Sequence, residues 1–470
     1  MHESPITADY VIKGAGAIGM AFADSIFTET DATMVIVDRH DRPGGHWNDA
    51  YPFVRLHQPS SSYGVNSAPL GTGATDTIGL NAGYEELASG QEVLSHFDLV
   101  MSQTFLPSGR VHYFPMSEID DEGVVTSLLS GERFHVEAGR FVDGTHSAMS
   151  VPSTTAPTYT VSPEMTCVAV NELSRRAPTF DEFVVIGAGK TGMDACIWLL
   201  NNGADPSQVK WIVPRDSWVL NRGNVQFGEA HFARLCKSIA DQAEAAALSD
   251  SIDEVFSRLE GAGEISRLDP NVEPGAYHCA ILSDAEMTQL RSVGEIVRLG
   301  RVVAIHADRM ELKRGEIPTS QNVLHVDCSA AGIPSHPETT IFDGDRITLQ
   351  WVRTCQPTFS AALIGFVESA FDDDETKNRL CAPIMPPTVP FDMLRVLRVN
   401  LANRSAWNNY PNIGDWMTRS RLEGFSKLAQ TQLAVDPKAA EHLERYLSHV
   451  ASAMANLDKL LAKSDGGVPQ

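Results

Sequence analysis

The sequence is short of positive charge and of long apolar segments. It holds 37 Lys and Arg against 60 Asp and Glu, a formal net charge of −23 over 470 residues. Such an excess of negative charge argues against binding to nucleic acid or to an anionic membrane surface. No apolar run approaches the ~18 residues that cross a bilayer, and the first strand is expected from about Asp9, without a secretory leader. We therefore expect a soluble, cytoplasmic protein of two or three domains.

Closely spaced cysteines are also missing. The seven cysteines are scattered along the chain, and no two of them are spaced as CxxC. This spacing predicts neither the redox-active dithiol of a disulfide reductase nor an ordinary zinc site, so we expect no metal. Several of the cysteines lie in apolar or helical surroundings, which favours small buried side chains.

The strongest motif that is present lies near the start, in YVIKGAGAIGMAFA from Tyr10 to Ala23. A short strand pattern runs directly into three glycines, and an alanine-rich helical pattern follows. This order is typical of a βα turn that binds a dinucleotide. Gly14 allows the tight turn, Gly16 lets the backbone approach a pyrophosphate, and Gly19 lets the helix pack close to the strand. The phosphate charge would rest on free N–H groups at the helix N-terminus.

The next predicted strand, Met34 to Val37, ends on an acid. Asp38 stands 19 residues after Gly19, where a carboxylate can bond the hydroxyls of an adenosine ribose. Arg39 follows it and is included among the candidate cofactor-binding residues. The order of strand, glycine turn, helix, strand and acid predicts a dinucleotide site.

A second close-approach turn, Gly-Gly-His-Trp, begins six residues after this acid and ends on a large flat aromatic. YPxxR and a segment rich in Ser and Tyr follow. The whole combination resembles the flavin-binding half of the flavin-containing monooxygenases and Baeyer–Villiger monooxygenases. The residues that carry the resemblance are Asp38, Gly44, Gly45, Trp47, Tyr51, Pro52, Arg55 and Tyr63.

The resemblance implies an α/β fold of two Rossmann-like dinucleotide-binding domains, the first for FAD and the second for NADPH. It implies that Gly45 and Trp47 lie along the FAD. It also places His57 and Asn66 on the substrate side of the flavin, as candidate catalytic residues that shape protonation there. The implied reaction inserts oxygen into a small organic substrate after oxygen adds to the reduced flavin.

A second glycine fingerprint supports this reading. Phe183 to Ile186 form the expected strand, Met193 to Leu200 the helix, and the turn between them holds the remaining candidates. These candidates are Gly187, Gly189, Thr191 and Gly192. Two such fingerprints in one chain indicate a flavoprotein with two nucleotide sites.

The strand after this second helix, Val209 to Val213, does not end on an acid. It is followed by Pro214 and Arg215, and a nearby arginine is the group that accommodates a ribose 2′-phosphate. NADPH is therefore favoured over NADH, although Asp216 could take the ribose role instead. Arg222 belongs to a stretch that resembles the phosphate-binding stretch of the monooxygenases.

The remaining pattern predicts the domain order. The first part of the FAD domain spans 1–165, and the NADPH domain with a helical insert at 229–260 spans 166–327. Residues 328–390 return to the FAD domain, and 391–470 form a C-terminal helical region. The proline-rich segment 147–179 is expected to be a connection, and crossings near 152–178 and 328–334 are expected to form a hinge. The C-terminal helices, expected at 391–402, 416–430 and 439–463, could be a lid, a homodimer surface or plain packing.

Two departures from the monooxygenase pattern leave alternatives open. The chain has no FxGxxxH segment, and His146 stands where the family more often has an ATG-like turn. These departures favour the alternative of an NADPH-flavin reductase or dehydrogenase that does not insert oxygen. A cofactor-bound binding protein without turnover is a second alternative. The sequence does not identify the substrate.

Overall fold

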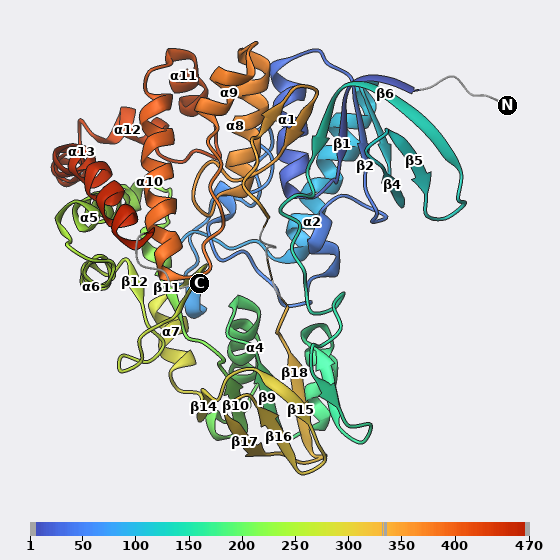
Figure 1. Ribbon diagram of the computed structural model, residues 1–470, viewed down its shortest axis with the longest axis vertical. Helices are drawn as coiled ribbons and strands as arrows, with labels where there is room; N and C mark the ends of the chain where they lie inside the picture. The colour runs from blue at the N-terminus through green and yellow to red at the C-terminus, as the bar shows by residue number, and fades with distance from the viewer. Residues whose placement is uncertain (1–5, 331, 333–335, 466–470) are drawn as a thin grey trace.

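The computed structural model describes residues 6–330, 332 and 336–465, and shows two α/β units joined to a body of helices (Figure 1). Pro334, the far end of the predicted second crossing, lies outside the described residues, as do the first five and last five positions of the predicted outer domains. Within the described part of the chain, no helix has both the length and the apolar character needed to cross a membrane.

The first unit is built on an eight-stranded sheet in the order β19-β20-β6-β1-β2-β3, with β5 and β4 continuing from β6. The strands β20, β6, β1, β2 and β3 run parallel, so their carboxyl ends meet at one edge. The strands are β1 (Ile6–Lys13), β2 (Met34–Val37), β3 (Val111–Phe114), β4 (Ser117–Ile119), β5 (Val124–Ser127), β6 (Arg133–Asp143), β19 (Phe342–Asp343) and β20 (Arg346–Thr348).

Helices from distant parts of the chain pack on this sheet. The helices are α1 (Ala17–Glu29), α2 (Gly90–Leu99), α8 (Pro357–Ala370) and α9 (Asp374–Leu380). Helix α8 lies along α1, and Gly365 allows the close approach, because a Cβ there would lie 2.8 Å from Cβ of Ser25. The chain therefore returns to the first unit after leaving it, and the predicted insertion of the second α/β unit into the first is confirmed.

The second unit has a parallel sheet in the order β14-β10-β9-β18-β8, with an antiparallel ribbon β17-β16-β15 that β7 extends in parallel. Its strands are β7 (Thr160–Val161), β8 (Thr166–Ala169), β9 (Glu182–Ile186), β10 (Val209–Ile212), β14 (Glu295–Val297), β15 (Val302–Ile305), β16 (Arg309–Leu312), β17 (Gly315–Pro318) and β18 (Val323–Asp327). Its helices are α3 (Leu173–Arg176), α4 (Lys190–Asn201) and α7 (Asp284–Leu290).

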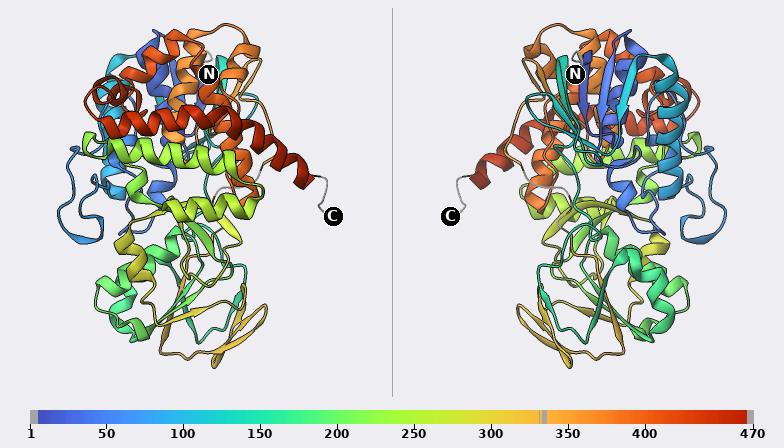
Figure 2. Two further views of the ribbon diagram at one scale, coloured as in Figure 1. Left: turned by 90° about the vertical axis from the view of Figure 1, so that its left-hand side faces the viewer. Right: turned by 90° about the vertical axis from the view of Figure 1, so that its right-hand side faces the viewer.

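A third body combines the insert with the C-terminal helices. Its three-stranded sheet has the order β12-β11-β13, and α13 lies along α5 (Figure 2). The elements are β11 (Ser217–Asn221), β12 (Ile265–Ser266), β13 (Ala276–Leu282), α5 (Phe232–Leu248), α6 (Ile252–Ala262), α10 (Pro390–Trp407), α11 (Pro411–Arg419), α12 (Ser426–Gln432) and α13 (Pro437–Asp465). Of the roles considered for the C-terminal helices, α13 shows packing, and its partner is the insert.

The helical insert expected at 229–260 is confirmed as α5 and α6, the second of which Ser251 caps. Two other sequence predictions of secondary structure were wrong. The segment 147–179, expected to be a connection, contributes β7 and β8 to the sheets of the second unit. The helix expected at 416–430 is broken, because Gly424 has a φ of +71° and Arg421 leaves the helical path to donate to the carbonyls of Ser61, Tyr63 and Val65.

Candidate functional site

The first glycine turn leaves the N-terminus of α1 without a side-chain cap. Gly14 has a φ of +97°, and a Cβ on Gly19 would lie 2.0 Å from the Gly14 carbonyl oxygen, so both positions need glycine. Gly16 is the N-cap of α1, and no side chain accepts from the first turn. By contrast, Ser89 and Glu92 cap α2 reciprocally. The free N–H groups at the start of α1 are therefore suited to donate hydrogen bonds to a bound anion.

The second glycine turn meets the first at this point. A Cβ on Gly45 would lie 2.9 Å from Cα of Gly16, and a Cβ on Gly16 would lie 3.6 Å from Cα of Gly45. Gly44 has a φ of +127° and precedes the short 3-10 helix η1 (Gly45–Asp49). Two side-chain-free turns thus face each other over the end of β1, which fits the passage of a pyrophosphate.

Asp38 lies at the end of β2 as predicted, but it already accepts several hydrogen bonds. The residue as a whole is 6% exposed, and its Oδ2 accepts from the Ala15 N–H at 2.6 Å. Oδ1 accepts from the His40 N–H at 2.8 Å and lies 2.9 Å from His40 Nδ1, while His40 Nε2 lies 2.9 Å from Asp49 Oδ2. The bond to Asp38, helped by Asp49, raises the pKa of His40 to about 9. Arg39 is exposed beside them.

Trp47 holds the segment that follows. It is buried, and its Nε1 donates to the Tyr63 hydroxyl at 2.8 Å. Burial raises the pKa of Tyr63, so the hydroxyl stays protonated and accepts this bond. The tryptophan therefore fixes the Ser- and Tyr-rich segment against η1.

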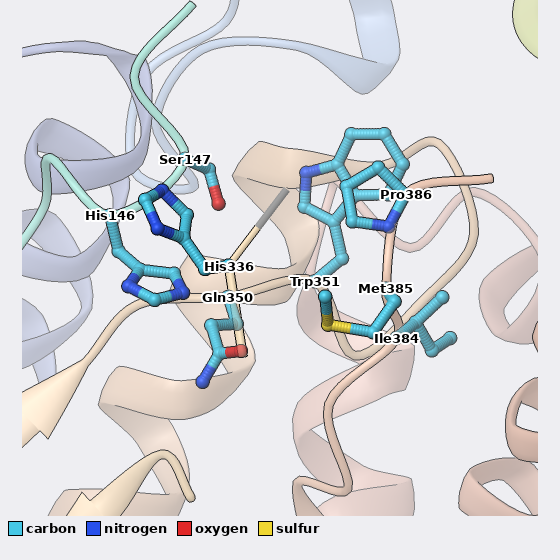
Figure 3. A pocket seen from close by; sticks show the side chains of 8 residues that line it. All are labelled: His146, Ser147, His336, Gln350, Trp351, Ile384, Met385 and Pro386. Carbon is cyan, nitrogen blue, oxygen red and sulfur yellow. The ribbon is translucent and has the colours of Figure 1, made fainter. Parts of the chain in front are cut away.

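The loops that follow β6 and β20 come together at one edge of the first sheet. His146 follows β6, and Gln350 and Trp351 follow β20; together with His336 they line a small cavity (Figure 3). The rings of His146 and His336 lie 4.4 Å apart, and burial and this neighbour lower the pKa of His146. The full lining is His146, Ser147, His336, Gln350, Trp351, Ile384, Met385 and Pro386.

Two buried polar atoms at this edge have no hydrogen-bond partner. They are Oγ1 of Thr354 and Oε1 of Gln356, in the loop between β20 and α8. Buried polar groups in native proteins are nearly always bonded, so these two atoms have unused hydrogen-bonding capacity. The uncapped α1, the facing glycines and these two atoms all fit a dinucleotide laid across the edge of the sheet.

The structure separates the two predicted catalytic residues. His57 is half-buried, its Nδ1 accepts from the Ile281 N–H of β13 at 3.2 Å, and loss of solvation lowers its pKa to about 3. Asn66 instead accepts a hydrogen bond on Oδ1 from Ser420 at 2.9 Å, at the end of α11. His57 is therefore a neutral acceptor that holds the insert, and Asn66 contacts the C-terminal region.

The second fingerprint repeats the geometry of the first. Gly187 has a φ of +119°, and a Cβ on Gly192 would lie 2.1 Å from the Gly187 carbonyl oxygen. Gly189 is the N-cap of α4 and, like Gly16, has no side-chain cap. Nothing lies within 4 Å of a Cβ built on Gly189. Thr191 sits half-buried in the first turn of α4.

At the end of β10, the two candidates for contact with the ribose or its 2′-phosphate, Asp216 and Arg215, lie in different environments. Asp216 is buried and accepts from Arg298 through both oxygens, at 2.9 and 3.0 Å. Arg215 is exposed at the same edge. The carboxylate is therefore engaged within the protein, and the arginine is the group that faces solvent.

Arg222 lies deep between the units. It is 0% exposed, pairs with Glu286 at 2.7 Å, and also donates to Asn81 and to the His57 carbonyl. Its guanidinium is thus already matched by acceptors from three parts of the chain. Sequence reasoning missed Glu286 because it lies 64 residues further on, within α7.

A cavity of about 480 Å³ lies between loop 53–87 of the first unit and α4 of the second. Phe53 stacks on Trp198 along its wall, with ring centroids 5.3 Å apart. Asp194, which also lines the cavity, pairs with Lys190 and accepts from the Tyr51 hydroxyl. The cavity is therefore lined by aromatic rings and by paired charges.

Two of the scattered cysteines, whose spacing gave no reason to expect a pair, are bonded in the structure. Cys279 and Cys355 form a disulfide across 76 positions, with Cα atoms 6.3 Å apart. The CxxC spacing could not indicate this pair, because that spacing concerns only cysteines that are close in sequence. The expectation for the others is confirmed in four cases: Cys196, Cys236, Cys328 and Cys381 are buried.

The fold and the two glycine turns define a chain of two α/β units of the dinucleotide-binding type, with the second inserted into the first. No model of a known protein family matches the chain. The chain is 43% identical over 457 residues to an uncharacterized protein of Mycobacterium tuberculosis (strain ATCC 25618 / H37Rv). The match covers 97% of this chain and 85% of that relative. A protein of Mycobacterium bovis matches equally. The chain belongs to the family of these mycobacterial proteins.

Solved structures resemble it at much lower identity. Cyclohexanone monooxygenase from Rhodococcus sp. Phi1, bound to NADP+, is 14% identical with a TM-score of 0.48, and the match covers 98% of both chains. A steroid monooxygenase bound to NADP is 13% identical with a TM-score of 0.49, over 77% of this chain and 85% of that one. At such identity the likeness concerns the fold, and the site rests on the contacts of this chain.

Proposed function

We propose that this chain is an NADPH-dependent FAD oxidoreductase that acts as a monooxygenase on a small organic substrate. The observation that carries the proposal is the pair of uncapped, glycine-started helices, α1 and α4, one in each α/β unit. Neither helix has an acidic residue in its first turn, so both N-termini are suited to a pyrophosphate.

We assign FAD to the first unit. Gly14, Gly16 and Gly45 would let its pyrophosphate approach the backbone. Asp38 would bond the adenosine ribose through the second lone pair of Oδ2, because Ala15 N–H takes only one and His40 bonds to Oδ1. Arg39 and Trp47 lie on the same side as candidate contacts. The flavin half would lie over the ends of β6 and β20, where Thr354 and Gln356 have unpartnered polar atoms. Bound there, FAD supplies the hydride acceptor and the reaction with oxygen.

We assign NADPH to the turn with Gly187, Gly189 and Thr191. Arg215 is exposed at the end of β10, whereas Asp216 is bonded to Arg298, and this arrangement favours a 2′-phosphate over a ribose 2′-hydroxyl. We assign Arg222 a positioning role, since Glu286 and Asn81 already accept its donors.

The division of the chain into domains at 165, 327 and 390 is part of the proposal. So is a positioning role for His57, which holds β13 against the first unit as a neutral acceptor. Asn66 would fix the segment after η1 to the C-terminal region. Neither side chain needs to exchange a proton in this account.

The test is anaerobic reduction by NADPH followed by admission of oxygen, observed by flavin absorbance. Bleaching followed by a transient spectrum that is neither oxidised nor reduced flavin is expected. Bleaching followed by immediate return of the oxidised spectrum would favour the second candidate, a reductase without oxygen insertion. His146 in place of an ATG-like turn favours that candidate. A protein that binds FAD and is not bleached would contradict both.

A further inference from the structure

The disulfide between Cys279 and Cys355 joins two parts of the molecule. Cys279 lies in β13, within the small sheet of the insert. Cys355 lies in the loop between β20 and α8, within the segment that returns to the first unit. Besides this bond, β13 is held to the first unit and its return segment by Ile281 N–H to His57 and by Tyr277 N–H to the Thr388 carbonyl, both at 3.2 Å.

The order of the first sheet places the loop that carries Cys355 on the side of β1 where the flavin end of the proposed FAD site would lie. Asp38, after β2, marks the adenosine end, and the turn after β1 marks the pyrophosphate. The rest of the cofactor must then extend to the other side of β1, over β6 and β20. Cys355 stands in the loop that begins directly after β20.

Side chains around Cys355 support this placement. Thr354 and Gln356, its two neighbours in sequence, carry the buried polar atoms without partners. Trp351 belongs to the apolar cluster against which both cysteines pack, and it also lines the cavity with His146 and Gln350 (Figure 3). The disulfide and the candidate flavin edge therefore share one loop and one tryptophan.

We propose that Cys279–Cys355 is a redox-active disulfide that the reduced flavin of the same chain reduces, an inference that rests on the proposed function. The S–S bond breaks, two electrons and two protons are added, and two thiols form while the flavin returns to its oxidised state. NADPH and one proton supply the equivalents, so the sum is NADPH + H⁺ + disulfide giving NADP⁺ + two thiols. When the pair is reduced, only hydrogen bonds and packing attach β13 to the first unit and its return segment.

The experiment counts thiols and electrons in the flavin-loaded protein. The oxidised protein is titrated with NADPH without oxygen, quenched in acid, alkylated with N-ethylmaleimide and mapped by mass spectrometry. We expect two newly labelled residues, Cys279 and Cys355, and two NADPH per flavin for complete reduction. Cys355→Ser should need one NADPH per flavin, whereas Cys381→Ser, a buried free cysteine, should still need two.

One NADPH per flavin with the disulfide peptide intact would overturn the inference and leave the proposed function standing. If NADPH does not bleach the flavin, the proposed function fails instead. The same thiol count is then made after dithionite bleaching, with wild-type protein stripped of its flavin and treated with the same dithionite as the background. Labelling above that background supports the inference, and labelling equal to it overturns it. The wild-type count decides even if a cysteine variant does not fold.

Discussion

The Tyr51 hydroxyl donates to Asp194 Oδ2 at 2.6 Å, and this bond links the first α/β unit to the second. Tyr51 comes from the loop after η1, and Asp194 lies one turn into α4, where Lys190 pairs with it. Burial, and after it the neighbouring Asp194 carboxylate, raise the pKa of Tyr51, so the hydroxyl remains a donor throughout the physiological range. The bond therefore fixes the first unit against the helix that begins the proposed NADPH site.

Tyr51→Phe should lower the free energy of unfolding by about 1.5–3 kcal/mol, the usual cost of losing a hydrogen bond to a charged group. Equilibrium urea unfolding measures the change. Tyr113→Phe is the matched control, because the buried Tyr113 hydroxyl has no partner and its removal should leave stability equal or slightly higher. Equal losses in both variants would show that the bond to Asp194 contributes nothing specific.

Gly16→Ala and Gly189→Ala should separate the two cofactor sites. Both glycines have ordinary negative φ values, and an added Cβ meets only Gly45 Cα at 3.6 Å in the first case and nothing within 4 Å in the second. Both variants should therefore fold. Gly16→Ala should lose at least about tenfold in flavin affinity, roughly 1.4 kcal/mol. Gly189→Ala should keep its flavin, as measured by absorbance after gel filtration. Flavin retained equally by both would remove FAD from the first turn.

Arg215→Ala should erode the preference for NADPH. The loss of one charge-assisted contact to a 2′-phosphate costs about 1.5–3 kcal/mol, or roughly one to two decades in affinity for NADPH. NADH lacks that phosphate and serves as the internal control, with little change expected. Reduction rates at several concentrations of each coenzyme give the two affinities, and parallel losses would assign the arginine to structure.

His40 should make stability depend on pH. Its pKa is about 9 in the folded protein, above the unfolded value of about 6.5, so its contribution is fully present below about pH 6.5 and is lost as pH rises through about 9. The gap in unfolding free energy between wild type and His40→Gln should shrink by about 1–2 kcal/mol between pH 6 and pH 10, after allowance for solvent screening. A gap that does not change with pH would mean that His40 is not charged beside Asp38.

The two glycine turns could be predicted because each is local. Strand, turn and helix follow one another within one short stretch, and the steric need for Gly19 and Gly192 is set by the carbonyl five residues earlier. The distant contacts could not be predicted in this way. The partners of Cys279 and Arg222 lie 76 and 64 residues further on, and only the fold brings them close. Arg222, for which a motif suggests a phosphate contact, is paired with Glu286 and lines the cavity between the two units, so its contact with a cofactor stays a prediction.

The most direct test of the central claim compares wild type with Gly189→Ala in one anaerobic experiment, with flavin absorbance as the readout. NADPH should bleach the flavin of the wild type. The variant should retain its flavin but need at least about tenfold more NADPH for the same rate, which corresponds to roughly 1.4 kcal/mol. Dithionite should bleach both equally. A wild-type protein purified without flavin, or a variant that NADPH reduces as readily as the wild type, would contradict the assignment of FAD to α1 and NADPH to α4.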